Sequence, residues 1–186
     1  MAIIVYLGST VEEYREKSLN ILESLEISCP DHFRKMALHG HYTRVIKESG
    51  EEILIYRLIC HESGKTHSIL PDFLQPHKQY SANEIERAFN ESDAALEPCE
   101  TKVKASIYTR RRWLKTMGAK VIGWVSQMMF LAADTTGRTP SLVLLADLPP
   151  IKQIITVAEY LPKIKTSGNA LGMACMYLGF RFPYTP

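Results

Sequence analysis

The chain has 186 residues, enough for one domain of ordinary size or two small ones, and an apolar share of 46% excludes long disorder. Its four cysteines are widely spread, which argues against a disulfide framework, and its formal net charge is only +2. No apolar run reaches the roughly 18 residues of a membrane span, and the apolar start is too short for a signal peptide. We therefore expect a cytoplasmic protein with no membrane contact.

The first 25 residues predict a strand followed by a helix. Ala2 to Leu7 is a short apolar run with β-branched residues, as in strands. Ser9 and Glu12 then have the spacing of a capping box, in which the two side chains satisfy backbone N–H groups at a helix start. The apolar spacing that follows predicts a helix to about Leu25.

Residues 29–71 have the layout of a zinc ribbon. The turns Cys29-Pro30-Asp31-His32 and Cys60-His61-Glu62-Ser63 each offer two ligand positions three residues apart. Two strand-like runs, 36–46 and 51–60, lie between these turns and are joined by a tight turn at 48–50, and Ser68 to Leu70 could add a third strand. Zinc prefers a closed tetrahedron of thiolate and imidazole ligands, and two such turns on a hairpin can supply it.

Cys29, His32 and Cys60 are the predicted zinc ligands. Ser63 stands at the fourth ligand position, but a neutral hydroxyl binds zinc weakly, so His61, His67 or a water molecule are alternatives. The competing interpretation is a ribbon that has lost its metal and is held by packing alone.

The second half of the chain predicts a series of helices. A capping box at Ser81 and Glu84 opens a helix to Asn90, and the polar residues 91–100 read as a loop. The remaining predicted helices run from Thr101 or Ala105 to Met117, ended by Gly118, and over 119–133, 149–161 and 168–179. Residues 141–148 fit a strand or a short helix.

Charge is distributed unevenly along the chain. Residues 1–100 carry 10 basic and 17 acidic side chains, whereas residues 101–186 carry 12 basic and 3 acidic ones. Between Thr101 and Ala133 there is no acidic residue. A concentrated positive stretch of this kind is an electrostatic signature of phosphate binding.

The helix ending at Met117 is predicted to be amphipathic. On a helical wheel Val103, Ile107, Leu114 and Met117 share one side, with Trp113 at its margin. Arg110 falls among them, so either it pairs or extends to solvent, or the predicted helix is out of phase. The polar side resembles a recognition surface for the major groove of double-stranded DNA, with the predicted contacts Lys104, Tyr108, Thr109, Arg111, Arg112 and Lys115. The alternative is a plain basic amphipathic helix in solvent.

Several motifs resemble a known family. The runs Leu38-His39-Gly40-His41-Tyr42-Thr43-Arg44, 53–60 and 64–74 are similar to those of a bacterial family of unknown function, whose short members combine a zinc ribbon with a helix-turn-helix. These proteins look like the DNA-binding regions of insertion-sequence transposases, and residues 106–113 resemble a transposase-type recognition helix. The resemblance implies DNA binding and an association with mobile elements, but no reaction.

The predicted fold class is α+β: a zinc-ribbon-like module (1–78), a helix-turn-helix region (79–135) and C-terminal helices (136–186) that form a bundle or a homodimer contact. Asp134, Asp147 and Glu159 are spaced too closely for the carboxylate triad of a transposase core, so we expect a DNA-binding protein that is not an enzyme. The alternative is a protein-interaction module with a degenerate ribbon and no role in nucleic-acid binding.

Overall fold

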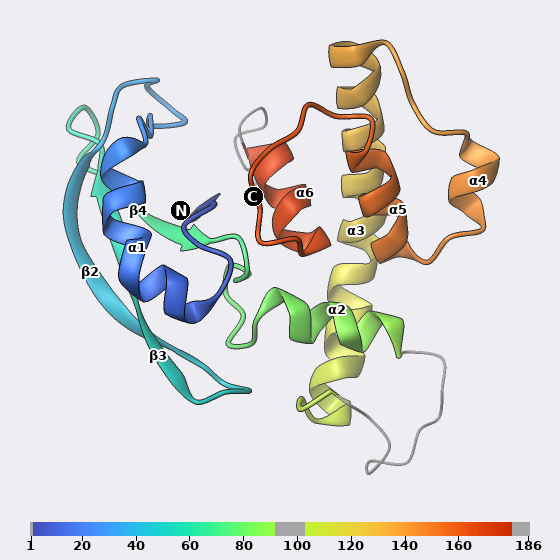
Figure 1. Cartoon of the computed structure of the whole chain (residues 1–186), viewed down its shortest axis with the longest axis horizontal. Coiled ribbons are helices and arrows are strands. Elements are labelled where there is room, and N and C mark those ends of the chain that lie inside the picture. The colour runs from blue at the N-terminus through green and yellow to red at the C-terminus, as the bar shows by residue number, and fades with distance from the viewer. Residues whose placement is uncertain (1, 92–102, 180–186) are drawn as a thin grey trace.

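The strands of the first half of the chain form one mixed sheet, and helices cover it and extend beyond it (Figure 1). The computed structural model describes residues 2–91 and 103–179. Its strands are β1 (Ala2–Val5), β2 (Ala37–Ile46), β3 (Glu51–Ile59) and β4 (Thr66–Pro71). Its helices are α1 (Val11–Ser24), α2 (Ala82–Asn90), α3 (Ile107–Thr136), α4 (Leu142–Ala146), α5 (Pro150–Ala158) and α6 (Ala170–Gly179). The predicted α+β class is confirmed.

The sheet has the strand order β1-β4-β3-β2. The predicted hairpin is present as the antiparallel pair β2–β3, in which Ile46 faces Glu51 across the turn, and the predicted third strand is β4. The N-terminal strand also exists, but it joins the sheet parallel to β4, with Ala2 opposite Ser68. Nothing in the local sequence of β1 specifies this partner, because parallel pairing depends on segments that are distant along the chain.

Helix α1 begins one residue later than predicted. The N-cap is Thr10, whose hydroxyl accepts from the backbone N–H of Glu13, while a carboxylate oxygen of Glu13 accepts from the N–H of Ser9 at 2.9 Å. The box therefore uses Thr10 and Glu13 instead of Ser9 and Glu12. Tyr14 secures the helix, because its ring meets Phe73 edge-on at 5.9 Å between centroids and its hydroxyl donates to the carbonyl of Leu54 on β3.

The predicted end of a helix at Gly118 is wrong, because α3 runs unbroken through it for 30 residues. An interior glycine lowers helix stability by only about 1 kcal/mol, and packing along both halves of α3 outweighs that cost. The helix ends instead at Gly137, which adopts the left-handed conformation with φ of 67° and donates to the carbonyl of Ala133. Within the described ranges, no helix is both long enough and apolar enough to span a membrane.

Helix α6 joins two buried clusters of apolar side chains. One cluster lies between the sheet and α1, and the other lies among α2, α3, α5 and α6. Leu171, Ala174 and Leu178 face the helical cluster, whereas Cys175 and Met176 face the sheet cluster. Figure 1 shows α6 between the sheet and α3 accordingly. The predicted division into three domains stays a prediction.

Two carboxylates hold the start of α6 against the rest of the chain. Asp72, directly after β4, accepts from the backbone N–H of Ser167 at 2.6 Å, and burial raises its pKa. Glu86 on α2 accepts from the N–H of Leu171 at 2.8 Å, and burial raises its pKa to about 7. Glu86 thereby takes up an N–H group of the first turn of α6, which has no partner within the helix, and Asp72 binds the segment that leads into the helix.

The close approach of α6 to the end of β4 requires a glycine. A Cβ at Gly172 would overlap the carbonyl oxygen of Asp72 and lie 2.8 Å from its carbonyl carbon. We expect Gly172→Ala to lower the free energy of unfolding by about 1–3 kcal/mol, the usual cost of overpacking. Urea unfolding followed by circular dichroism measures this change.

Gly118→Ala is the matched control, because no atom lies within 4 Å of a Cβ placed there. Alanine in the middle of α3 should raise the free energy of unfolding by up to about 1 kcal/mol. Equal stabilities of Gly172→Ala and the wild type would contradict the packing argument.

Candidate functional site

Two turns of the same geometry bring the predicted metal ligands together. In the first, Cys29 O accepts from the N–H of Phe33 and Cys29 N–H donates to the carbonyl of Arg34. In the second, Cys60 O accepts from the N–H of Gly64 and Cys60 N–H donates to the carbonyl of Lys65. Both turns place their fifth residue in the left-handed region, with φ of 54° at Phe33 and 67° at Gly64. The turns are thus equivalent, and His32 and Ser63 occupy matching positions.

Cys29, His32 and Cys60 lie close enough together to bind a metal ion. The Sγ atoms of Cys29 and Cys60 are each 3.5 Å from Nδ1 of His32. A tetrahedral zinc site with bond lengths of about 2.3 Å to sulfur and 2.0–2.1 Å to nitrogen has S···N separations of about 3.5 Å. Both cysteines are buried, and thiolate and imidazole are the donor types that zinc prefers.

The second turn also adjusts the chemistry of Cys60. Hydrogen bonds from Ser63, from both its side chain and its backbone, lower the pKa of the Cys60 thiol to about 6. A thiolate is the form that binds metal. Ser63, at the predicted fourth ligand position, therefore favours metal binding by lowering the pKa of Cys60. His61 is exposed and is not among the three clustered residues.

His67 on β4 lies beside the metal cluster but is not one of its three residues. Its side chain is buried, with 2% exposure, and its Nε2 lies 3.9 Å from Sγ of Cys29. Burial lowers the pKa of His67, which favours the neutral imidazole that metals require. The sequence offered His67 only as one of several alternatives, because its spacing from Cys60 differs from that of a second tight turn.

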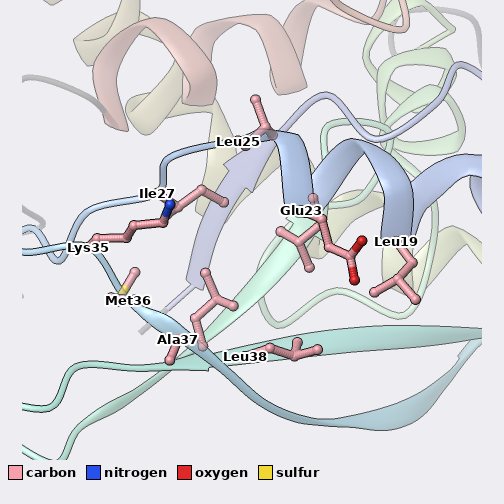
Figure 2. A pocket seen from close by; sticks show the side chains of 10 residues that line it. Leu19, Glu23, Leu25, Ile27, Lys35, Met36, Ala37 and Leu38 are labelled. Carbon is pink, nitrogen blue, oxygen red and sulfur yellow. The ribbon is translucent and has the colours of Figure 1, made fainter.

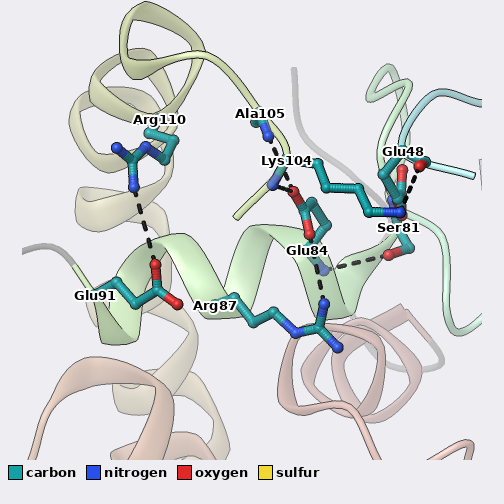
Figure 3. Close-up of polar contacts among 8 residues, drawn as sticks. All are labelled: Glu48, Ser81, Glu84, Arg87, Glu91, Lys104, Ala105 and Arg110. Carbon is teal, nitrogen blue, oxygen red and sulfur yellow. Dashed lines mark hydrogen bonds and ion pairs between the residues drawn. The ribbon is translucent and has the colours of Figure 1, made fainter. Parts of the chain in front are cut away.

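A buried carboxylate positions the start of α3 (Figure 3). Glu84 on α2 is 1% exposed, and its Oε1 accepts from the backbone N–H groups of Lys104 and Ala105, the latter at 3.0 Å. Its own N–H donates to the hydroxyl of Ser81, so the predicted cap of α2 is confirmed. The sequence pattern predicted only this cap. The contact of Glu84 with Lys104 and Ala105, about twenty residues later in the chain, cannot be predicted from the local sequence.

Two predicted DNA-contacting residues are already engaged within the fold. Lys104 donates through Nζ to the carbonyl of Glu48 at 3.0 Å, and the hydroxyl of Thr109 lies 3.0 Å from that of Ser106 (Figure 3 shows the Lys104 contact). Arg110 pairs with Glu91 at 4.0 Å, which is how this cation is accommodated beside apolar neighbours. The side chains of Lys104 and Thr109 therefore serve the local structure.

The other predicted DNA-contacting residues form an exposed face, which we call the basic face: Tyr108, Arg111, Arg112 and Lys115. Positions separated by three, four and seven residues lie on one side of a helix. No carboxylate pairs with these three cations in the part of the chain that the structure describes. Tyr108 projects from this face with 80% of its surface exposed.

The buried side of α3 is rotated from the predicted one. Trp113, placed at the margin, is 3% exposed and meets Tyr80 edge-on at 5.0 Å between centroids. Ile107, predicted as apolar core, is 47% exposed. The reason is that α2 approaches the side of the helix near Trp113, and a large aromatic ring buries more area there than an isoleucine at the first turn.

The predicted helix-turn-helix stays a prediction. Residues 91–106 lie between α2 and α3, whereas the connecting turn of that motif has three or four residues. Residues 92–102 of this connection, which include most of the predicted loop and one of the two predicted helix starts, lie outside the described residues.

An apolar pocket of about 470 Å³ lies beside the β2–β3 hairpin, between α1 and the start of β2 (Figure 2). Leu19, Leu25 and Leu38 line it, and Glu23 and Lys35 supply its charged groups. It contains no cluster of donor atoms suited to metal binding or catalysis among the residues that line it.

Phe33 is strained where its counterpart Gly64 is not. A left-handed conformation costs a residue with a Cβ about 1–2 kcal/mol, and Phe33 is 83% exposed, so little burial compensates. We expect Phe33→Gly to raise the free energy of unfolding by about 1 kcal/mol. Phe33→Ala keeps the Cβ and should not do so. Chemical unfolding of the three proteins at one metal concentration makes the comparison, and equal effects of glycine and alanine would contradict it.

One of the comparisons with known proteins found a match. Residues 29–113 match the model of a family described as a domain of unknown function (DUF6431). The matched segment begins at the first cysteine of the metal cluster and ends in the exposed turns of α3. No curated protein and no solved structure matches the chain. The chain is therefore similar, over these residues, to a family that has no assigned function.

Proposed function

We propose that this protein binds double-stranded DNA through the basic face of α3, on a fold stabilised by a zinc ion, and that it is not an enzyme. The observation that carries the proposal is the basic face itself. Arg111, Arg112 and Lys115 are exposed near the start of α3 without an ion pair in the described chain, so their charges are available to a polyanion. Tyr108 adds a group that can both stack and donate a hydrogen bond.

The fold supports such a face by fixing its orientation. Glu84 holds residues 104 and 105 at the entrance to α3, and Trp113 anchors the opposite side of the helix. Arginine and lysine on an anchored helix can contact phosphates, and arginine can also pair with guanine in the major groove. A link to mobile elements rests on the resemblance of residues 106–113 to transposase recognition helices.

Zinc would be held by Cys29, His32 and Cys60, with His67 as the fourth ligand. A zinc ion bound there would cross-link the two equivalent turns and β4, and it would carry no catalytic role in a fully ligated site. The small sheet makes such a cross-link valuable, because β2 is an edge strand with several exposed side chains.

A second candidate function, a protein-interaction module, is favoured by one observation, the apolar pocket beside α1 (Figure 2). It predicts that neutralising the basic face leaves the binding properties of the protein unchanged, so the experiments below separate the two.

Protein purified without chelator should contain one zinc ion per chain. We expect His67→Gln to lower zinc affinity at least about tenfold, and Cys60→Ser to lower it further, because each removes a ligand. His39→Gln on β2 is the control for a histidine outside the cluster, and Ser63→Ala tests the hydroxyl as a ligand. Zinc content by elemental analysis and competition with a chromophoric chelator give the values.

Absence of zinc from the wild-type protein would contradict the metal site. Equal zinc affinities of His67→Gln and His39→Gln would contradict the assignment of His67 alone, and a loss in Ser63→Ala that matches Cys60→Ser would move the fourth ligand to Ser63.

The protein should bind a labelled duplex with an affinity that falls steeply with added salt. The slope of log K against log salt is about −0.9 for each phosphate contacted. Arg111→Ala combined with Arg112→Ala should reduce this slope by about 2 and weaken binding. Fluorescence anisotropy over a salt series measures both quantities.

Arg138→Ala combined with Lys152→Ala removes two exposed cations elsewhere and serves as the matched control. Identical losses in the two double variants would mean that general charge, and not the basic face, retains the duplex. No duplex binding by the wild type at low salt would exclude the proposed function.

A further inference from the structure

A second, smaller cavity lies between α3 and the segment that follows β4. It has a volume of about 250 Å³, below the roughly 300–1,000 Å³ of pockets for drug-sized ligands. Apolar atoms form most of its wall, which includes Met117 and Trp124. The polar and cationic side chains that line it are Gln75, His77, Lys78, Thr116 and Lys120. The size suits a single small charged group better than a complete cofactor.

Gln75, which lines the cavity, carries a buried hydrogen-bond donor that has no partner among the described residues. Gln75 is 2% exposed, and its Nε2 makes no hydrogen bond to any described residue. Its Oε1 accepts from the thiol of Cys175 at 3.6 Å. Burial raises the pKa of Cys175 to about 12, so the thiol keeps its proton and fixes the amide with its NH₂ group free. An unsatisfied buried donor is costly, which points to a ligand that accepts from it.

The cations at and near this cavity, Lys78, Lys120 and Arg112, are not paired with carboxylates in the described part of the chain. Partial burial lowers the pKa of Lys78, and the neighbouring charges of Arg112 and Lys120 lower it further. Like charges held together raise the electrostatic energy of the empty cavity. An anion that enters it is therefore stabilised by Lys78 and Lys120, which line it, and by the neighbouring charge of Arg112.

The segment that carries the donor and one cation is fixed in place. Arg44 on β2 donates to the carbonyl oxygens of both Gln75 and Lys78. His77, between them, adopts a left-handed conformation with φ of 58°, which is unfavourable for a residue with a side chain. Contacts from β2 therefore hold the segment in a shape it would not adopt alone, as is common where a binding site is preformed.

We infer that this cavity binds a phosphate group, with Gln75 Nε2 as the hydrogen-bond donor and Lys78 and Lys120 as the lining cations. Arg112 adds a positive charge nearby. The phosphate could belong to a free small molecule or to a nucleic-acid backbone, since the chemistry is the same. The inference goes beyond the basic face, because Gln75 and Lys78 lie outside α3, and it holds for the free anion even if the protein does not bind DNA.

The test titrates the full-length protein with inorganic phosphate at constant ionic strength, followed by isothermal calorimetry, and in parallel with a labelled duplex. We expect saturable phosphate binding, with chloride as the background anion giving none. Lys120→Gln and Gln75→Leu should each weaken it at least about tenfold, because each removes one contact to the anion. Lys120 is exposed, so its variant keeps the test valid if Gln75→Leu fails to fold. Lys152→Gln on α5 is the control and should bind phosphate as the wild type does.

The two titrations identify the source of the phosphate. Saturable binding of inorganic phosphate that the two variants weaken supports a site for a free phosphate, whether or not the duplex binds. If inorganic phosphate does not saturate but Lys120→Gln and Gln75→Leu weaken duplex binding more than Lys152→Gln does, the cavity holds a backbone phosphate. Duplex binding that all three variants leave intact, with no saturable phosphate binding, overturns the inference and leaves the basic face untouched. Absence of both kinds of binding overturns both proposals.

Discussion

The packing of α6 against the end of β4 is the contact on which the two halves of the molecule depend. Gly172 lets the helix backbone meet the backbone of Asp72 directly, and the side chains that follow enter both apolar clusters. Asp72 and Glu86 bind the N–H groups at the start of this helix, so the sheet and α2 are attached to the same turn. The segment from β4 to α2, which includes Gln75 and Lys78, is thereby held between two fixed elements.

The hairpin β2–β3 determines the geometry of the metal cluster. Two turns of equal geometry need only two cysteines and one histidine to bring three donors together, because the hairpin sets the distance between the turns. Ser63 lowers the pKa of the Cys60 thiol, and His67 on the neighbouring strand β4 lies beside Cys29. The cluster is a property of the sheet as much as of the turns.

Local patterns in the sequence were sufficient for the hairpin, for β4, for α2 with its Ser81 cap and for the three clustered donors. They failed where the outcome depends on distant partners. The parallel pairing of β1, the continuation of α3 through Gly118 and the burial of Trp113 in place of Ile107 all depend on what the segment packs against. The roles of Glu84 and Gln75 follow the same rule, since each serves groups many residues away.

The position of β1 has a consequence for how the chain folds. Of the strands in this sheet it comes first along the chain, and among the described residues it pairs with β4, so that Ala2 lies opposite Ser68. Closing so long a loop is slow compared with forming the β2–β3 hairpin, which is joined by a short turn. We therefore expect the hairpin to form before β1 pairs with β4.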